Sequence, residues 1–264
     1  MILRVGSLNC EYLRDGHTLA DAVKAAEHKH GKLDVLALQE ISTIRSRQLR
    51  SFAAELGMNV SVLSTPDAEI GLGNALLVRA DGPAVSSVQS WTLQCRREDR
   101  SAVALELATL GMRICCTHLD HQNERVRLNQ LGQLHAHLHP IGSLLLLGDF
   151  NAIRRADYND DEWTALVRGR EQAHIETETA VVDELERPLE SGGVWGLTDS
   201  RALAGRRGGP TQTSCFGARV DYVWASALAL QRWRVIGSTH VQLHPEGITD
   251  HNLVVCELQL AAQV

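Results

Sequence analysis

The sequence contains no apolar run long enough to cross a membrane, because its longest hydrophobic stretches have the length of a single strand. Its first residues, Met-Ile-Leu-Arg-Val-Gly-Ser-Leu-Asn, lack the apolar core and the cleavage site of a signal peptide. Internal repeats and low-complexity linkers are missing as well. We therefore expect a cytoplasmic protein without a membrane span.

Two further absences concern cysteine pairs and basic charge. The six cysteines show no CxxC spacing, and Cys115 and Cys116 are adjacent in an apolar run, so we expect buried thiols rather than a disulfide framework. The 26 Lys and Arg residues are outnumbered by 32 Asp and Glu, which gives a net charge of −6. This charge argues against a protein that coats nucleic acid non-specifically, although an enzyme whose bound cations offset its acids remains compatible with it.

The composition is that of a globular protein, with 44% hydrophobic and 22% charged residues. A length of 264 residues suits one large domain or two small ones. Residues 154–209 differ in texture, since they are charged, helical in parts and then rich in glycine and arginine. We expect a single catalytic domain over residues 1–264, with a variable helical and loop insertion around 154–209.

Hydrophobic periodicity predicts roughly a dozen strands and a few helices. Strands are expected at 2–8, 33–39, 58–64, 74–79, 85–93, 101–108, 112–118, the leucine run from Leu144, 219–225, 231–237 and 252–260. Helices are expected at 43–56, 123–139, 159–170, 178–187 and from the capping-box spacing Thr18-Leu-Ala-Asp21 to Gly31. This mixture favours an α+β or layered α/β domain over a simple parallel doubly wound sheet.

Several predicted strands end on polar residues. Four leucines run directly into Gly148-Asp149-Phe150-Asn151, and an ionised carboxylate in that position is costly unless something uses its charge. Loops at the ends of buried strands are where catalytic residues collect on a rigid scaffold. Similar endings occur at Asn9, Glu40, His118 with Asp120, Asp221, and Asp250 with His251.

Each ending taken alone has a simpler explanation. A carboxylate after a strand commonly forms a turn or a helix cap, and a lone histidine in a strand is commonly a core residue. Together, however, the endings supply oxygen ligands for a cation such as Mg²⁺ and two imidazoles for proton transfer or phosphate contact.

In this order the motifs resemble the endonuclease/exonuclease/phosphatase superfamily, which includes deoxyribonucleases, abasic-site endonucleases, tyrosyl-DNA phosphodiesterase, deadenylases and neutral sphingomyelinases. The strand pair at Gly73-Asn-Ala-Leu-Leu and Arg100-Ser-Ala-Val-Ala is also similar, and the match spans residues 2–258. The resemblance implies a four-layer α/β/β/α sandwich of two packed, mostly antiparallel sheets flanked by helices. The active site is then expected where both sheets end.

The resemblance also implies a metal site and substrate contacts. Glu40 would be the principal ligand of Mg²⁺ or Mn²⁺, with Asn9 beside it and Asp250 as a possible ligand of a second site. Mg²⁺ usually keeps several waters, so this small set is sufficient. Arg100 and Asn74, from the similar strand pair, are candidate contacts to the substrate. Whether one or two metals act stays open.

The catalytic roles are implied in the same way. Asp149 would orient or deprotonate the attacking water, and Asn151 would donate to a phosphate oxygen. His251 would lie at the scissile phosphate with Asp221 fixing its tautomer, while His118 would contact the phosphate from the other sheet. The choice between Asp149 and His251 as general base stays open, because their titrations are coupled.

Three functions follow from this reading. The first is a metal-dependent phosphodiesterase acting on nucleic acid or a nucleic-acid adduct, and the second is a phosphatase or phosphodiesterase for a small or lipid phosphate. The third, a binding module without catalysis, is opposed by the complete set of acids, amides and imidazoles. We infer no obligate protein partner. Arg206 and Arg207 could contact a phosphate backbone, and Trp163 and Trp195 could stack on a base, although a surface loop and ordinary packing are the simpler interpretations.

Overall fold

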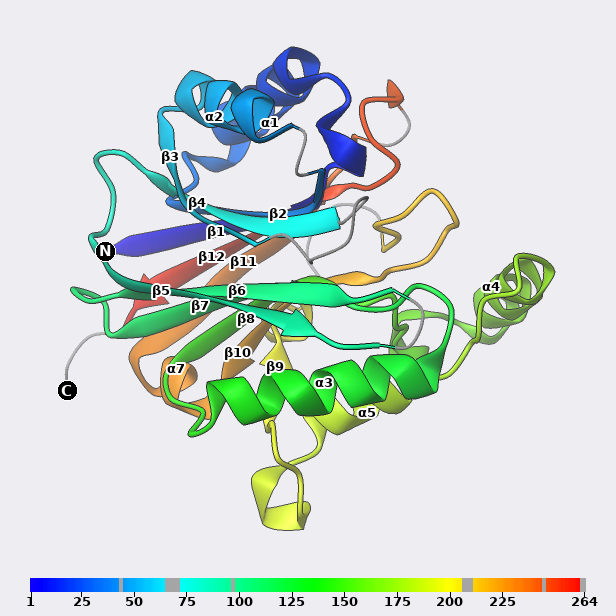
Figure 1. Ribbon diagram of the computed structural model, residues 1–264. Coiled ribbons are helices and arrows are strands. Elements are labelled where there is room, and N and C mark those ends of the chain that lie inside the picture. Colours follow the sequence, from blue (N-terminus) through cyan, green and yellow to red (C-terminus); the bar gives the residue numbers. More distant parts are fainter. Residues whose placement is uncertain (43–44, 65–71, 96–97, 206–210, 244–245, 262–264) are drawn as a thin grey trace.

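The computed structural model describes the whole chain except residues 43–44, 65–71, 96–97, 206–210, 244–245 and 262–264. Two six-stranded sheets face each other, and helices cover the outer face of each (Figure 1). The predicted four-layer α/β/β/α sandwich is therefore confirmed. Among the described residues, no helix is both long and apolar enough to span a membrane.

The first sheet has the strand order β11-β12-β1-β2-β4-β3. Only β1 and β2 run parallel, joined by α1, whereas the other neighbours in this sheet are antiparallel. Helices α1 and α2 cover its outer face (Figure 1). The bounds are β1 Ile2–Asn9, α1 Gly16–His30, β2 Val35–Ser42, α2 Ser46–Glu55, β3 Met58–Ser64, β4 Leu72–Arg79, β11 Trp233–Val241 and β12 Leu253–Leu260.

The second sheet has the order β5-β6-β7-β8-β10-β9, and again a single pair, β7 and β8, is parallel. Helix α3 joins that pair and covers the outer face together with α5, while α4 projects to the side (Figure 1). The bounds are β5 Val85–Leu93, β6 Arg100–Leu107, β7 Met112–His118, α3 Glu124–Leu138, β8 Leu144–Asp149, α4 Asp160–Gln172, α5 Ala180–Glu186, β9 Leu197–Asp199, α6 Ser200–Leu203, β10 Asp221–Ser226 and α7 Ala227–Arg232. Short 3₁₀ turns occur at Glu11–Leu13, Arg155–Asp157 and Leu189–Ser191.

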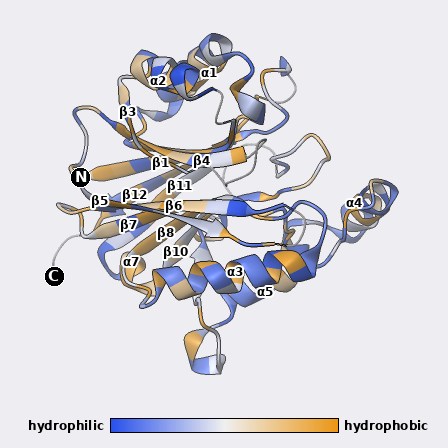
Figure 2. Ribbon diagram, in the orientation of Figure 1, coloured by the Kyte–Doolittle hydropathy of each residue, from blue (hydrophilic) through white to orange (hydrophobic). Residues whose placement is uncertain are grey.

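The leucine run of β8 is explained by the two apolar layers that it separates. Leu145 and Leu147 pack between the sheets, and Leu144 and Leu146 pack under α3 and α5. Side chains of a strand alternate between its faces, so a strand that is buried on both faces is apolar throughout. Figure 2 shows the hydrophobic strands between the more polar outer helices.

Several predicted bounds differ from the structure by a few residues, among them the start of α1 and the start of β10. The capping box expected at Thr18 is wrong, because α1 begins after Asp15, whose carboxylate accepts the N–H groups of His17 and Thr18. Gly31 ends this helix, as predicted, with a φ of 91° that favours glycine. Asp221 is the first residue of β10 instead of lying inside the strand.

Residues of the 154–209 segment take part in the second sheet. Val182 and Leu185 of α5 and the buried Trp195 belong to the apolar cluster under that sheet, and β9 pairs with β10. Packing is thus the role of Trp195, while the half-buried Trp163 ring lies 5.1 Å from the guanidinium of Arg155. Arg206 and Arg207 lie outside the described residues.

Candidate active site

Strand register brings three of the predicted residues side by side on the second sheet. In the ladder, Asp149 at the end of β8 pairs with His118 on β7 and with Asp221 on β10. Gly148 permits this arrangement, because a Cβ built on it would lie 1.9 Å from the carbonyl oxygen of Thr117. Its φ of 141° is also one that other residues rarely adopt. The leucine strand therefore needs glycine immediately before the acid that it presents.

The first sheet brings its own polar residues to the same end of the sandwich. Asn9 is the last residue of β1, and Glu40 lies in β2 at an irregularity of its pairing with β4, where its φ is 60°. Such bulges re-aim side chains near functional sites. The loop before β12 carries Asp250 and His251, and the hydroxyl of Thr249 ties this loop to the carbonyl oxygen of Asn9 at 3.0 Å.

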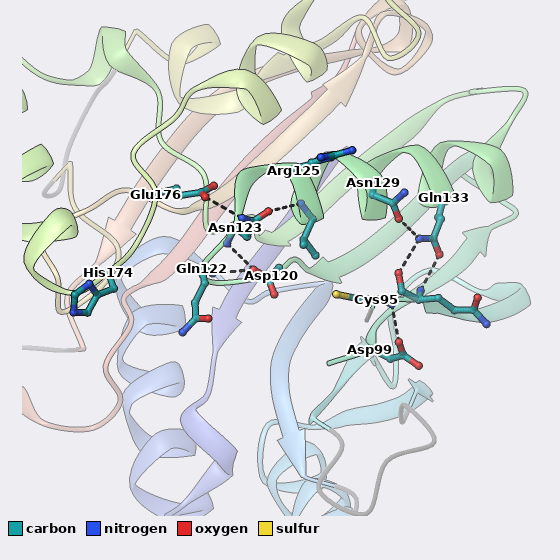
Figure 3. Close-up of a pocket in the computed structure, with 12 residues that line it drawn as sticks. Cys95, Asp99, Asp120, Gln122, Asn123, Arg125, Asn129, Gln133, His174 and Glu176 are labelled. Carbon is teal, nitrogen blue, oxygen red and sulfur yellow. Dashed lines mark hydrogen bonds between the residues drawn. The ribbon is translucent and has the colours of Figure 1, made fainter. Parts of the chain in front are cut away.

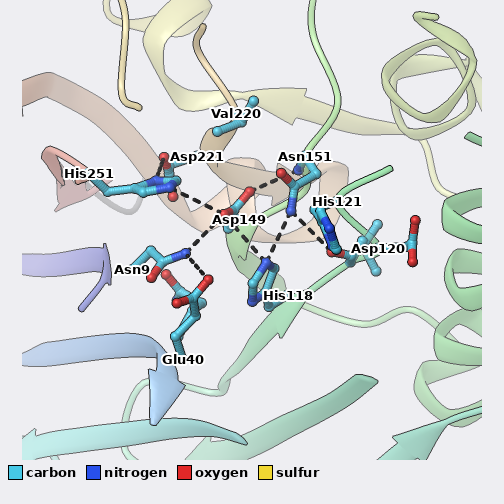
Figure 4. Close-up of polar contacts among 12 residues, drawn as sticks. Asn9, Glu40, His118, Asp120, His121, Asp149, Asn151, Val220, Asp221 and His251 are labelled. Carbon is cyan, nitrogen blue, oxygen red and sulfur yellow. Dashed lines mark hydrogen bonds and ion pairs between the residues drawn. The ribbon is translucent and has the colours of Figure 1, made fainter. Parts of the chain in front are cut away.

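The amide of Asn9 joins the two sheets (Figure 4). Its Nδ2 donates to Oε1 of Glu40 and to Oδ2 of Asp149, in each case at 3.1 Å. Because carboxylate oxygens without a proton only accept hydrogen bonds, both amide hydrogens serve acids from opposite sheets. The residues predicted from distant parts of the chain thus converge, with Glu40 linked to His251 through Asn9 and Asp149.

Asp149 lies between two imidazoles. Its Oδ2 is 3.6 Å from Nε2 of His118 and 3.7 Å from Nε2 of His251, and its Oδ1 accepts the N–H of Asn151 at 2.9 Å. Burial, followed by the charge of Asp221, raises the pKa of Asp149 to about 7. A carboxyl with such a pKa can exchange a proton near neutral pH.

His251 is paired with a carboxylate at its other nitrogen. Nδ1 of His251 donates to Oδ2 of Asp221 at 2.8 Å, and the backbone N–H of Asp221 is itself held by the hydroxyl of Thr213 at 3.1 Å. Burial alone would lower the pKa of His251, but the charge of Asp221 and this hydrogen bond outweigh it and raise the pKa to about 10. The imidazole is therefore a cation aimed at Asp149.

His118 is held in the opposite state. Nδ2 of Asn151 donates to the carbonyl oxygen of Leu119 at 3.1 Å, which fixes the orientation of the amide, and the same nitrogen lies 3.0 Å from Nε2 of His118. An amide nitrogen only donates, so Nε2 of His118 accepts and carries no proton. Burial, then the charge of Arg100, lowers the pKa of His118 well below 6.5, in agreement with this assignment. Both amide hydrogens of Asn151 are occupied in this arrangement.

The acids of the site could hold a cation. Burial, and further the charge of Asp250, raises the pKa of Glu40, and Oδ1 of Asp250 is buried without a hydrogen-bond partner among the described residues. These groups offer the oxygen donors that Mg²⁺ and Mn²⁺ prefer. Within the described part of the chain, Asp149, Asp221 and His251 also form a group whose ligand atoms lie within 4.8 Å of one another. The hydrogen bond between His251 and Asp221 and the ladder pairing of Asp149 with Asp221 bring these three residues together.

The strand pair at Gly73 and Arg100 supplied two predicted substrate contacts. Arg100 borders the site, whereas Asn74 lies between the sheets. Arg100 is buried at the start of β6, and its Nη2 lies 3.1 Å from Nδ1 of His121. The amide of Asn74 donates to the backbone and the hydroxyl oxygens of Ser101, at 2.7 and 3.0 Å, and so links β4 to β6. His121, which Figure 4 shows beside His118 and Asn151, was not singled out from the sequence, although its spacing from His118 was a usable signal.

A polar groove of about 1130 Å³ begins two residues beyond His118 (Figure 3). Figure 3 shows Asp120 and Gln122 between His174 and Glu176 on one side and Cys95 and Asp99 on the other, along the first turns of α3. None of its described lining residues is Phe, Tyr or Trp, and amides and acids predominate. The groove therefore offers hydrogen bonds to a polar group next to the site.

A model of the endonuclease/exonuclease/phosphatase family matches residues 6–251, which include every residue of the converging site. The chain belongs to this family. Members of the endonuclease/exonuclease/phosphatase family are phosphoester hydrolases that depend on a divalent metal, and they include nucleases, phosphatases and phosphodiesterases. A comparison with curated proteins found no match.

Solved structures of the family share this fold at low identity. An endonuclease/exonuclease/phosphatase from Bacteroides vulgatus has a TM-score of 0.72 and 16% identity, with 99% of this chain and 100% of that chain covered. TDP2 from D. rerio, solved with a single-strand DNA product, has a TM-score of 0.66 and 13% identity, with 98% of this chain and 99% of that chain covered. A mannosyl-6-phosphatase from Bacteroides thetaiotaomicron has a TM-score of 0.60 and 15% identity, with 98% of this chain and 100% of that chain covered. At these identities the likeness concerns the fold.

Proposed function

We propose that the protein is a divalent-metal-dependent phosphodiesterase that hydrolyses phosphodiester bonds of nucleic acid or of a nucleic-acid adduct. The observation that carries this proposal is the position of Asp149 between the imidazoles of His118 and His251, with Asn9 linking it to Glu40. The attack of water on a phosphoester requires a proton acceptor, positive charge near the phosphate and oxygen ligands for a metal. Asp149, His251 and Glu40 could supply these three at one point. A non-catalytic scaffold would have no use for this arrangement.

In this proposal Asp149 accepts the proton of the attacking water. His251, charged and oriented by Asp221, stabilises negative charge on the phosphate, as the orienting acid of a catalytic triad supports its histidine. His118, kept neutral by burial and by the charge of Arg100, contacts the phosphate from the second sheet, and Arg100 adds positive charge at the border of the site.

Glu40, Asn9 and Asp250 would hold Mg²⁺ or Mn²⁺. Two observations support this fit. Burial raises the pKa of Glu40, and Oδ1 of Asp250 is buried without a hydrogen-bond partner among the described residues. A bound cation would stabilise the charged form of Glu40 and would give Oδ1 of Asp250 a partner. When bound, the cation neutralises charge on the phosphate and stabilises the leaving oxygen.

A second candidate is a phosphatase or phosphodiesterase for a small phosphate ester. The groove beside His118 favours it, because Asp99, Asp120 and Glu176 line that groove against a single arginine, Arg125. Such a lining repels a chain of phosphates but suits the hydroxyl groups of a neutral leaving group. The structural likeness to a mannosyl-6-phosphatase agrees with this alternative.

Hydrolysis of bis-p-nitrophenyl phosphate tests the proposed chemistry. We expect that EDTA abolishes turnover and that Mg²⁺ or Mn²⁺ restores it, whereas undiminished turnover in chelator would remove the metal from the mechanism. A panel of single- and double-stranded DNA, RNA, a 5′-tyrosyl oligonucleotide, an abasic duplex, sphingomyelin and sugar or inositol phosphates then separates the two candidates. Preference for nucleic acid over small phosphates supports the first.

A further inference from the structure

The pair of Asp221 and His251 joins two parts of the chain that are 30 residues apart (Figure 4). Asp221 begins β10 of the second sheet, and His251 lies in the loop before β12 of the first. Only Oδ2 of Asp221 accepts from the imidazole, whereas its Oδ1 is buried and has no hydrogen-bond partner among the residues that the structure describes. The place of this carboxylate therefore depends on the backbone that carries it.

The hydroxyl of Thr213 holds that backbone. Thr213 is completely buried, and its Oγ1 accepts the N–H of Val220 at 3.0 Å and the N–H of Asp221 at 3.1 Å. A hydroxyl oxygen has two lone pairs, so two donors use its full capacity to accept. A buried N–H group without an acceptor is costly, and the start of β10 is therefore held to this one oxygen.

The main chain of the same residue holds the segment that carries His251. The carbonyl oxygen of Thr213 accepts the N–H of Asn252 at 2.7 Å. Two residues further on, the N–H of Cys215 donates to the carbonyl oxygen of Asp250 at 2.8 Å. His251 thus lies between two residues that are bonded to the segment beginning at Thr213.

The turn that contains Thr213 is closed by its own hydrogen bonds. The carbonyl oxygen of Ala218 accepts the N–H groups of Thr213 and Ser214, at 2.8 and 3.0 Å, and the hydroxyl of Ser214 at 3.2 Å. Nδ2 of Asn252 donates to the carbonyl oxygen of Gln212 at 3.2 Å and adds a further tie to the histidine segment. The side chain and the carbonyl group of Thr213 are therefore fixed relative to each other.

We propose that Thr213 is a positioning residue, whose hydroxyl places Asp221 and whose carbonyl group places the His251 segment, so that the acid stays on the imidazole. The inference rests on the proposed function and deepens it, because it assigns the residue that assembles the orienting pair. Thr213 acts through this pair and contacts neither the substrate nor a metal. A misplacement of about 1 Å in a catalytic group can cost about 100-fold in rate, which is why such a tie affects turnover.

A graded series of substitutions tests the hydroxyl. For Thr213→Val, which keeps the shape but has no acceptor, we expect kcat of Mg²⁺-dependent hydrolysis of bis-p-nitrophenyl phosphate to fall by about 10- to 100-fold with KM unchanged. Thr213→Ser keeps the oxygen and should restore the rate, and Thr213→Cys, with a weak acceptor, should lie between them. Thr198→Val, at a half-buried position of β9, is the matched control and should keep the wild-type kcat. A wild-type kcat in Thr213→Val would overturn the inference.

The Asp221→Asn background distinguishes positioning from a general loss of structure. If Thr213 acts through the carboxylate of Asp221, adding Thr213→Val to Asp221→Asn should cost no further rate, because the group to be placed is already gone. A second loss as large as the first would show that the hydroxyl serves the fold in general and would overturn the inference.

Proton NMR of the metal-free protein separates this inference from the proposed function. The hydrogen-bonded Nδ1–H of His251 should give a downfield signal in the wild-type protein and in Thr213→Ser, which is absent in Asp221→Asn and lost or shifted in Thr213→Val. If the wild-type protein cleaves no phosphoester, the proposed function fails, but this pattern still supports the role of Thr213. An unchanged signal in Thr213→Val would overturn that role at any level of activity. If circular dichroism shows that Thr213→Val does not fold, Thr213→Cys takes its place in each measurement.

Discussion

His118, on β7 of the second sheet, and His251, just before β12 of the first sheet, come from the two walls of the candidate site, and each wall is named here by its sheet. Both imidazoles are buried, yet their pKa values move in opposite directions. Burial disfavours the charged form of each. At His118, burial and then the charge of Arg100 lower the pKa well below 6.5, although the carboxylate of Asp149 is 3.6 Å away. At His251 the carboxylate of Asp221 is hydrogen-bonded at 2.8 Å, and the pKa rises to about 10. A carboxylate within hydrogen-bond distance therefore separates the cationic imidazole from the neutral one.

The acids of the two walls differ in a similar way. Asp149 on the second sheet is buried and accepts hydrogen bonds from Asn9 and Asn151, and its position is set by the strand ladder. Glu40 and Asp250 on the first sheet are more accessible, and Oδ1 of Asp250 has no protein partner among the described residues. The second wall is thus organised for proton transfer, and the first is available to a cation. Each site substitution below replaces a residue of one wall.

The largest effect is expected from Asp149→Asn and from His251→Ala. Each removes a group that acts on the proton or on the phosphate, so the rate should fall at least about 100-fold, the usual scale for an acid or base. Steady-state hydrolysis of bis-p-nitrophenyl phosphate measures it, with circular dichroism to establish folding. Asp161→Asn, an exposed acid of α4, is the control and should keep the wild-type rate. A wild-type rate in either site variant would remove that residue from the mechanism.

Gly148→Ala should disturb the second wall through the backbone. The new methyl group would overlap the carbonyl oxygen of Thr117, and the φ of 141° at residue 148 is unfavourable for alanine. We therefore expect the free energy of unfolding to fall by about 3 kcal/mol and the activity to be lost. Gly132→Ala is a matched substitution, because Gly132 lies within α3 and a Cβ there meets nothing within 4 Å. It should stabilise the protein by about 0.5–1 kcal/mol. Urea denaturation measures the change in unfolding free energy of both variants. If both variants were stabilised, or both destabilised, the geometric explanation would be contradicted.

Glu40→Gln addresses the first wall. Losing the charge of the principal proposed ligand should raise the Mg²⁺ concentration for half-maximal activity by at least about tenfold, within the 10- to 100-fold range typical around metal centres. Saturating metal should recover part of the rate, because Asp149 and His251 are unchanged. A metal titration of activity measures the shift. An unchanged midpoint with a reduced rate would instead assign Glu40 to catalysis.

The smallest perturbation is a change of pH on the metal-free protein. At pH 7.5, NMR of the imidazoles should show His251 protonated and His118 neutral. Because the folded pKa of His251 lies above its ordinary value, the pair with Asp221 stabilises the fold fully below about pH 6.5 and loses this contribution as the pH rises to about 10. Asp221→Asn should remove that dependence. Identical urea midpoints across this range in the wild-type protein would contradict the assigned charge of His251.

Residue patterns were sufficient for most of the fold. Strands β3, β5 and β7 have the predicted bounds, because the turn residues before them, at Gly57, Gly82-Pro83 and Gly111, mark where each strand starts. The start of α1 was misplaced, since Asp15 and Thr18 are both competent caps and only the path of the entering chain selects between them.

For the candidate site, the sequence alone determined which side chains stand at the ends of buried strands. It could do so because apolar runs and their polar endings are local patterns, and the order of the motifs along the chain is specific to one family. Only the tertiary structure decided what each side chain is next to. The pairing of Asp221 with His251, the contact of Asn151 with His118 and the bridge of Asn9 between two acids join residues far apart in the chain. Since charge state depends on such neighbours, the opposite states of the two histidines exist only in the folded protein.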